Sequence, residues 1–187
     1  ERLRRRGHEV EVYTSNLQAL PIPLNDFNSS MKISRFRGIS ICGKAVYPGA
    51  FWGLFLMKNP DVVHSHVVGF FSTFAAACLK PLKRYPLVVT LDFDPAEPEP
   101  PLLKRPYTFL YRTLPARMAD VLTAFTEEEK REFSRRFNLP LERIKRLPIG
   151  IDLEAFSVPP KRDRKVSLGL EGKFLLLNVS FLSPKKN

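Results

Sequence analysis

Short apolar runs and longer segments with one apolar face follow one another along the chain in a regular order. Runs rich in β-branched residues predict strands near residues 9–13, 61–65, 87–90, 121–124 and 144–147. Segments with helical spacing predict helices near residues 48–57, 69–80, 107–118 and 126–137. Because strands and helices alternate, the pattern predicts an α/β fold with a doubly wound parallel sheet.

Residues that cap helices support this assignment. Residues 1–6 hold four arginines ahead of Gly7, which is typical of the last turn of a helix and its left-handed end. Thr126 and Glu129 have the spacing of a capping box, so the helix that follows should begin there and run to about Phe137. Residues 32–41 alternate in polarity and predict one or two further strands.

The chain is organised around residues 60–79, where a short strand, a glycine turn at Gly69 and an apolar helix follow one another. His64, Ser65 and His66 stand at the carboxyl end of that strand. Ligands of open α/β sheets bind at the carboxyl ends of the strands. We therefore expect the functional site at this edge of the sheet.

A proline-rich segment leaves the carboxyl end of the next strand. Residues 91–106 hold five prolines and four acidic residues, the first of which is Asp92. Proline fixes φ and removes a backbone donor, so the segment predicts a semi-rigid loop. Further along, the charged residues 157–172 predict a linker, and the apolar residues 174–179 predict a strand of a second domain. This divides the chain into a domain at 1–156, a linker at 157–172 and the start of another domain at 173–187.

The net charge of +11 favours an anionic partner. Phosphorylated substrates and anionic lipid headgroups fit this charge, and a merely solvated basic surface remains an alternative. Nucleic acid is not expected, because no zinc-finger or RNA-binding pattern occurs. Cys42 and Cys78 fit no metal or redox spacing, and Cys78 is expected in the core. No apolar stretch reaches the roughly 20 residues that span a bilayer. We expect a cytoplasmic location.

Five segments, in this order and spacing, resemble the family 4 glycosyltransferases. They are R-R-R-G-H-E-V-E-V-Y-T-S at 4–15, P-D-V-V-H-S-H at 60–66, A-D-V-L-T-A-F-T-E-E-E-K at 119–130, R-I-K-R-L-P-I-G-I-D-L-E-A-F at 143–156, and L-N-V-S-F-L-S-P-K-K-N at 177–187. The resemblance implies a GT-B fold with two Rossmann-like domains, of which the first holds the acceptor and the second holds the nucleotide-sugar donor. It also implies a retaining, metal-independent transfer that needs no cofactor besides the donor.

The resemblance assigns candidate site residues. It implies a catalytic role for Asp92, acceptor binding by His66 and Ser65, and donor-phosphate binding by Lys186. It further implies sugar or lipid-linked acceptors at the cytoplasmic face of the membrane, with peripheral contact to anionic lipid. Three positions depart from the family pattern: Asp92 stands where a histidine is usual, Phe181 where an arginine is usual, and Ile149 where an asparagine is usual. These departures leave open an inactive remnant or a basic binding module.

The resemblance also implies elements beyond the two ends of the chain. The family's first strand is expected upstream of Glu1, and most of the donor domain is expected beyond Asn187. Residues 10–13 and 61–65 would then flank an unfilled strand position. The isolated chain is therefore expected to be marginally stable and to transfer no sugar.

Overall fold

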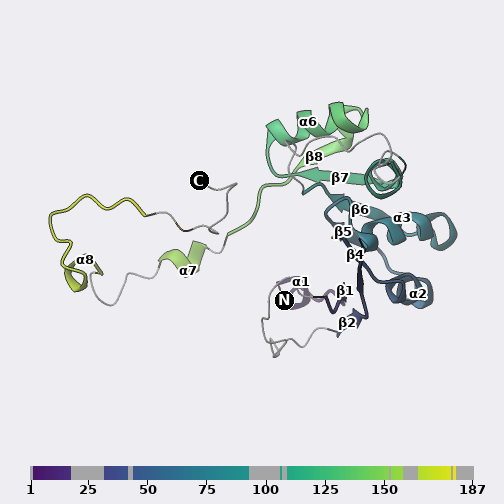
Figure 1. The fold of residues 1–187 in the computed structure, drawn as a ribbon, viewed down its shortest axis with the longest axis horizontal. Coiled ribbons are helices and arrows are strands. Elements are labelled where there is room, and N and C mark those ends of the chain that lie inside the picture. The colour runs from purple at the N-terminus through teal and green to yellow at the C-terminus, as the bar shows by residue number, and fades with distance from the viewer. Residues whose placement is uncertain are drawn as a thin grey trace. The chain divides into compact units, whose positions relative to one another are not determined.

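The computed structural model describes residues 2–17, 32–41, 44–92, 106, 109–151, 153–157, 164–177 and 179 (Figure 1). The chain divides into two compact units, Glu1–Ile149 and Gly150–Asn187, and the domain division expected from the sequence stays a prediction. None of the helices in the described ranges is both long and apolar enough to cross a membrane.

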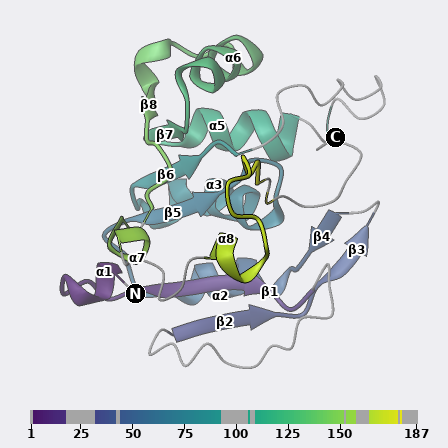
Figure 2. The same ribbon diagram turned by 90° about the vertical axis from the view of Figure 1, so that its left-hand side faces the viewer.

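A four-stranded parallel sheet forms the centre of the first unit (Figures 1 and 2). Its strands, in spatial order, are β5 (Val63–His66), β6 (Leu87–Thr90), β7 (Val121–Ala124) and β8 (Ile144–Arg146). The connecting helices include α3 (Phe71–Lys83), α5 (Leu114–Met118) and α6 (Glu127–Phe137), and the short 3-10 helix η3 (Leu141–Arg143) precedes β8. The predicted α/β fold with a parallel, Rossmann-like sheet is confirmed for these strands.

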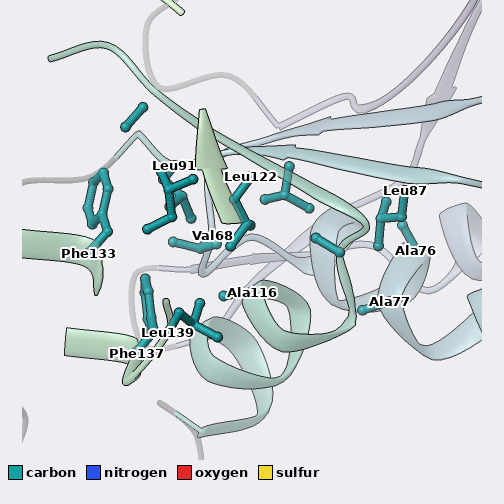
Figure 3. Packing of buried hydrophobic residues seen from close by; sticks show 14 of the residues in the cluster. Val68, Ala76, Ala77, Leu87, Leu91, Ala116, Leu122, Phe133, Phe137 and Leu139 are labelled. Atoms are coloured by element: carbon teal, nitrogen blue, oxygen red, sulfur yellow. The ribbon is translucent and has the colours of Figure 1, made fainter. Parts of the chain in front are cut away.

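One face of this sheet is packed against helices. Leu87, Val89 and Leu122 are fully buried, and they alternate along their strands with less completely buried positions. The alanines of α3 let that helix approach the sheet closely, and Phe133 and Phe137 of α6 close the core at its far end with rings 6.3 Å apart. Figure 3 shows Leu87 beside the α3 alanines, and it shows Leu122 between these residues and the two phenylalanines of α6. The core therefore fixes the positions of the strand ends.

Two smaller sheets accompany the central one. β1 (Glu11–Ser15) pairs in parallel with β2 (Lys32–Phe36), and β3 (Ile39–Ile41) pairs antiparallel with β4 (Lys44–Val46). Within the described residues, β1 has no pairing with β5, so the strand predicted at 9–13 lies in a separate sheet. The strand predicted at 9–13 therefore forms, but it does not belong to the same sheet as the other predicted strands.

Helix α2 (Gly49–Leu56) packs against the β1–β2 sheet through its glycines. A Cβ atom added at Gly53 would lie 2.4 Å from Cζ of Phe36 and 3.1 Å from Cε1 of Tyr13. The rings of Tyr13 and Phe36 are stacked with centroids 5.8 Å apart. Glycine is therefore required here because two aromatic rings occupy the space of a side chain.

Asp120 fastens the amino ends of β6 and β7 to α3. Its carboxylate accepts hydrogen bonds from Leu87 N (2.7 Å) and from Lys80 Nζ (2.7 Å), and its own N–H donates to Leu87 O (2.9 Å). The Lys80 ammonium and the Leu87 N–H lower the pKa of Asp120. The aspartate of the A-D-V segment at 119–121 thus holds the sheet together at the edge opposite the strand carboxyl ends.

The helix ends follow the sequence closely. α1 (Arg2–Arg5) is followed by Gly7 with φ of 88°, as expected for a left-handed helix end. At α6, Glu129 N donates to Thr126 Oγ1 (3.1 Å) and Thr126 N donates to Glu129 Oε2 (3.2 Å), which confirms the capping box. The predicted helix at 107–118 is a π-helix, η2 (Phe109–Thr113), that continues into α5.

Two further expectations differ from the structure. Cys78 is exposed on α3, because Ala75–Ala77 and Leu79 occupy the faces of the helix that meet the core. The short helices α7 (Leu153–Ser157) and α8 (Arg164–Ser167) lie in the part of the chain around residues 157–172, and the linker expected there stays a prediction. Residues 174–177 form no strand, since a strand needs a hydrogen-bonded neighbour and their backbone pairs with none in the described residues. Their side chains are instead exposed.

Candidate functional site

Polar side chains of three neighbouring strands meet at one level near the carboxyl edge of the central sheet. His66 of β5 is in register with Thr90 of β6, and Thr90 is in register with Thr123 of β7. Residues in register project from the same face of a parallel sheet. The structure therefore places a row of one imidazole and two hydroxyls at the edge where ligands of this fold class bind.

A chain of hydrogen bonds crosses these strands. Thr123 Oγ1 donates to Thr90 Oγ1 (2.9 Å), and Thr90 Oγ1 shares a hydrogen bond of 2.8 Å with His64 Nε2. Both threonines are buried, whereas His64 is exposed. The two threonines thereby fix the imidazole of His64 from inside the sheet.

His64 and His66 lie side by side on the exposed part of this face. Their ring centroids are 4.3 Å apart, with the planes tilted by 31°. Desolvation of its ring, and then repulsion from His66, lower the pKa of His64 below its usual value of 6.5. The lowered pKa favours the neutral form of the His64 imidazole.

Ser65 lies on the other face of β5. Its hydroxyl is buried and forms a hydrogen bond of 2.7 Å with Thr73 Oγ1 of α3. Thr73 in turn lies within hydrogen-bonding distance of the Val67 carbonyl oxygen, at 2.8 Å. The geometry gives Ser65 a role in holding α3 to the sheet, and the acceptor-binding role assigned to it stays a prediction.

The turn after His66 is strained. Val67 has φ of 67°, in the left-handed region that β-branched residues rarely adopt. Its N–H donates to Thr90 O (3.0 Å), and Gly69 N donates to Tyr111 O (2.8 Å) from η2. Strained backbone of this kind persists where surrounding contacts determine it, and it is frequent at functional sites. The sequence alone did not predict this conformation, because valine is not a turn residue.

Asp92 stands at the same edge as His66. The backbone of β6 continues past Thr90, because Leu91 N donates to Thr123 O (2.7 Å), and Leu91 is fully buried. Asp92 follows Leu91 on the opposite face of the strand, and this face also carries Thr90 and His66. The side chain of Asp92 is exposed. The structure thus brings the two predicted site residues to one edge, while their roles stay predictions.

Several predicted features lie outside the described residues. They are Lys186, Phe181, Cys42 and the loop at 93–105. Among the residues that are described, no three His, Cys, Asp or Glu side chains are grouped so that they could hold a metal ion. Thr90 and Thr123 were not predicted, although each is the last or next-to-last residue of an apolar strand. That shared position is the signal that could have identified them.

The model of Glycosyltransferase Family 4 matches residues 1–155. The chain belongs to glycosyltransferase family 4. No curated protein matched the chain. Family 4 membership supports a glycosyltransferase-type function with sugar-related substrates. His66, together with the hydrogen-bonded chain of His64, Thr90 and Thr123, is therefore the candidate sugar site of a family 4 domain.

Proposed function

We propose that this family 4 domain holds the acceptor in a transfer of sugar from a nucleotide-sugar donor to a cytoplasmic or lipid-linked acceptor. The observation that carries the proposal is the convergence of His66, Asp92 and the His64–Thr90–Thr123 chain at one sheet edge. Sugars are bound by groups that donate and accept hydrogen bonds at fixed positions. The imidazole of His64, held against a buried hydroxyl chain, is such a group.

Asp92 would accept a hydrogen bond from an acceptor hydroxyl. A carboxylate is an acceptor only, and its charge makes the hydrogen bond about twice as strong as a neutral one. It cannot neutralise the negative charge that develops on a departing diphosphate, which requires fixed positive charge. In this proposal Lys186 supplies charge for the donor phosphates, and no metal or further cofactor takes part.

A second candidate function is sugar binding without transfer. Asp92 favours it, because an acidic group replaces the histidine that the family pattern has at this position. For either function we place the protein in the cytoplasm, with peripheral contact at the membrane. The net charge of +11 supports contact with an anionic surface.

Nuclear magnetic resonance of the imidazoles tests the proposal. The sequence has three histidines, so His8, which is exposed on the turn before β1, is an internal reference. Octyl glycosides of glucose, galactose, mannose and N-acetylglucosamine serve as acceptor analogues. We expect at least one to shift the resonances of His64 and His66 while His8 stays unchanged.

Variants locate the binding energy. Asp92→Asn should weaken the binding of that glycoside by about tenfold, since a hydrogen bond to a charged group contributes about 1.5–3 kcal/mol. Asp61→Asn is the matched control, because Asp61 is exposed near the amino end of β5. If no glycoside shifts His64 or His66, or if the two variants bind equally well, the acceptor site lies elsewhere. Transfer from radiolabelled nucleotide sugars by the full protein then separates catalysis from binding alone.

A further inference from the structure

Helix α2 is apolar on both of its faces, which is unusual for a surface helix. All eight residues of G-A-F-W-G-L-F-L are apolar or glycine. Ala50 and Leu54 are buried on the side that meets the core. A helix that is apolar all round is normally covered on all sides, either by protein or by lipid.

The other side of α2 carries three large exposed side chains. Trp52, Phe55 and Leu56 have the i, i+3, i+4 spacing that places residues on one face of a helix. Their exposed fractions are 63%, 37% and 76%. The rings of Trp52 and Phe55 form an edge-to-face pair with centroids 6.0 Å apart. We call these three residues the α2 outer face.

Positive charge borders the α2 outer face at the carboxyl end of the helix. Lys83 Nζ of α3 donates to Met57 O (2.8 Å), which brings the carboxyl ends of α2 and α3 together. Leu82 beside it is 65% exposed, and Lys58 and Arg84 are also exposed. Residues 49–62 and 82–85 hold three cationic side chains, Lys58, Lys83 and Arg84, and one acidic side chain, Asp61.

We infer that the α2 outer face docks on the surface of an anionic lipid bilayer. Trp and Phe favour the boundary between headgroups and acyl chains, and an interfacial helix buries its apolar face about 5–10 Å deep there. Basic residues at the edge of such a face attract anionic headgroups. The charge border distinguishes this partner from an apolar protein groove. The inference names the surface for the membrane contact proposed above, and its test does not require sugar transfer.

Trp52 makes the contact directly observable, because it is the only tryptophan of the chain. The full chain is mixed with vesicles of phosphatidylcholine alone or with phosphatidylglycerol added. We expect the emission of Trp52 to move to shorter wavelength with the anionic vesicles, and brominated lipid to quench it. Raising the salt concentration should weaken binding, because exposed charges are screened.

Two variants that keep Trp52 separate the apolar contribution to vesicle binding from the electrostatic contribution. Phe55→Ser with Leu56→Ser should weaken partition into anionic vesicles by at least about tenfold. Lys58→Glu should weaken it by about tenfold, and only when the vesicles are anionic. The matched controls are Leu141→Ser, at a site 41% exposed on η3, and Lys145→Glu on β8, and neither should change binding.

The outcomes that overturn the inference are specific. It is wrong if anionic vesicles leave the emission of Trp52 unchanged, or if Leu141→Ser reduces partition as much as the double variant does. It is also wrong if the emission shifts with protein concentration in the absence of vesicles and sedimentation shows a dimer, because the partner is then a second copy. Circular dichroism of every variant shows that the fold is retained before the comparison is made.

Discussion

Replacing Asp120 by asparagine removes one charge and nearly preserves the shape of the side chain. The carboxylate receives two donors, the Leu87 N–H and the Lys80 ammonium, each at 2.7 Å. An asparagine has one acceptor oxygen, so one of the two donors would face an amide NH₂ instead. The substitution therefore tests whether this aspartate holds the amino ends of β6 and β7 in place.

The structure indicates the size of the effect. The hydrogen bond from the Leu87 N–H to a charged group contributes about 1.5–3 kcal/mol. The ion pair with Lys80 adds only about 0.2–1 kcal/mol, because the Asp120 side chain is 48% exposed and solvent screens it. We expect Asp120→Asn to lower the free energy of unfolding by about 2 kcal/mol, and the melting temperature by about 4–8 °C for a chain of this size.

Urea unfolding at several pH values provides the assay. The pKa of Asp120 is lowered in the folded state, so its contribution is complete above the unfolded value of about 4. The contribution is lost as the pH falls from there through the lower folded value. The difference between wild type and Asp120→Asn should therefore be constant near neutral pH and shrink in acid. Asp61→Asn, at an exposed site, should unfold like the wild type throughout.

Two results would refute this reasoning. If Asp120→Asn has the urea midpoint of the wild type at pH 7, the carboxylate contributes nothing to the sheet. If the two proteins differ equally at all pH values, the loss comes from packing and not from the charge.

Two further changes test local structure by urea unfolding. Thr126→Ala should lower the free energy of unfolding by about 1 kcal/mol, because it removes the acceptor of the Glu129 N–H at the start of α6; an unchanged midpoint would contradict the capping role. Val67→Gly should be more stable than Val67→Ala by about 1 kcal/mol, since only glycine adopts φ of 67° without strain, and the opposite order would show that this turn is relaxed.

Strands and helices of the central sheet could be predicted because local residues determine them. The β-branched runs at 87–90 and 121–124 became β6 and β7 within the same bounds. The capping box fixed the start of α6 in the same way. The first strand formed two residues later than predicted, at Glu11–Ser15, because its partner β2 determines where pairing begins and ends.

Features that depend on distant partners could not be predicted from local pattern. The apolar pattern of residues 174–177 predicts a strand, but a strand exists only when another backbone pairs with it. At the candidate site, the topology predicted that His66 and Asp92 share an edge. The chain from Thr123 through Thr90 to His64 depends on strand register, and the left-handed Val67 depends on bonds from β6 and α3. Neither register nor those bonds can be read from single positions.

The separation of β1 and β2 from the central sheet has a consequence for local opening. Amides of β6 and β7 exchange with solvent only when a sheet with a packed helical face comes apart. The β1–β2 ladder shares no hydrogen bonds with that sheet in the described residues, and it rests on α2 through the rings of Tyr13 and Phe36. Its amides can therefore exchange through a smaller opening, in which the two strands leave the glycine face of α2 while the core stays folded.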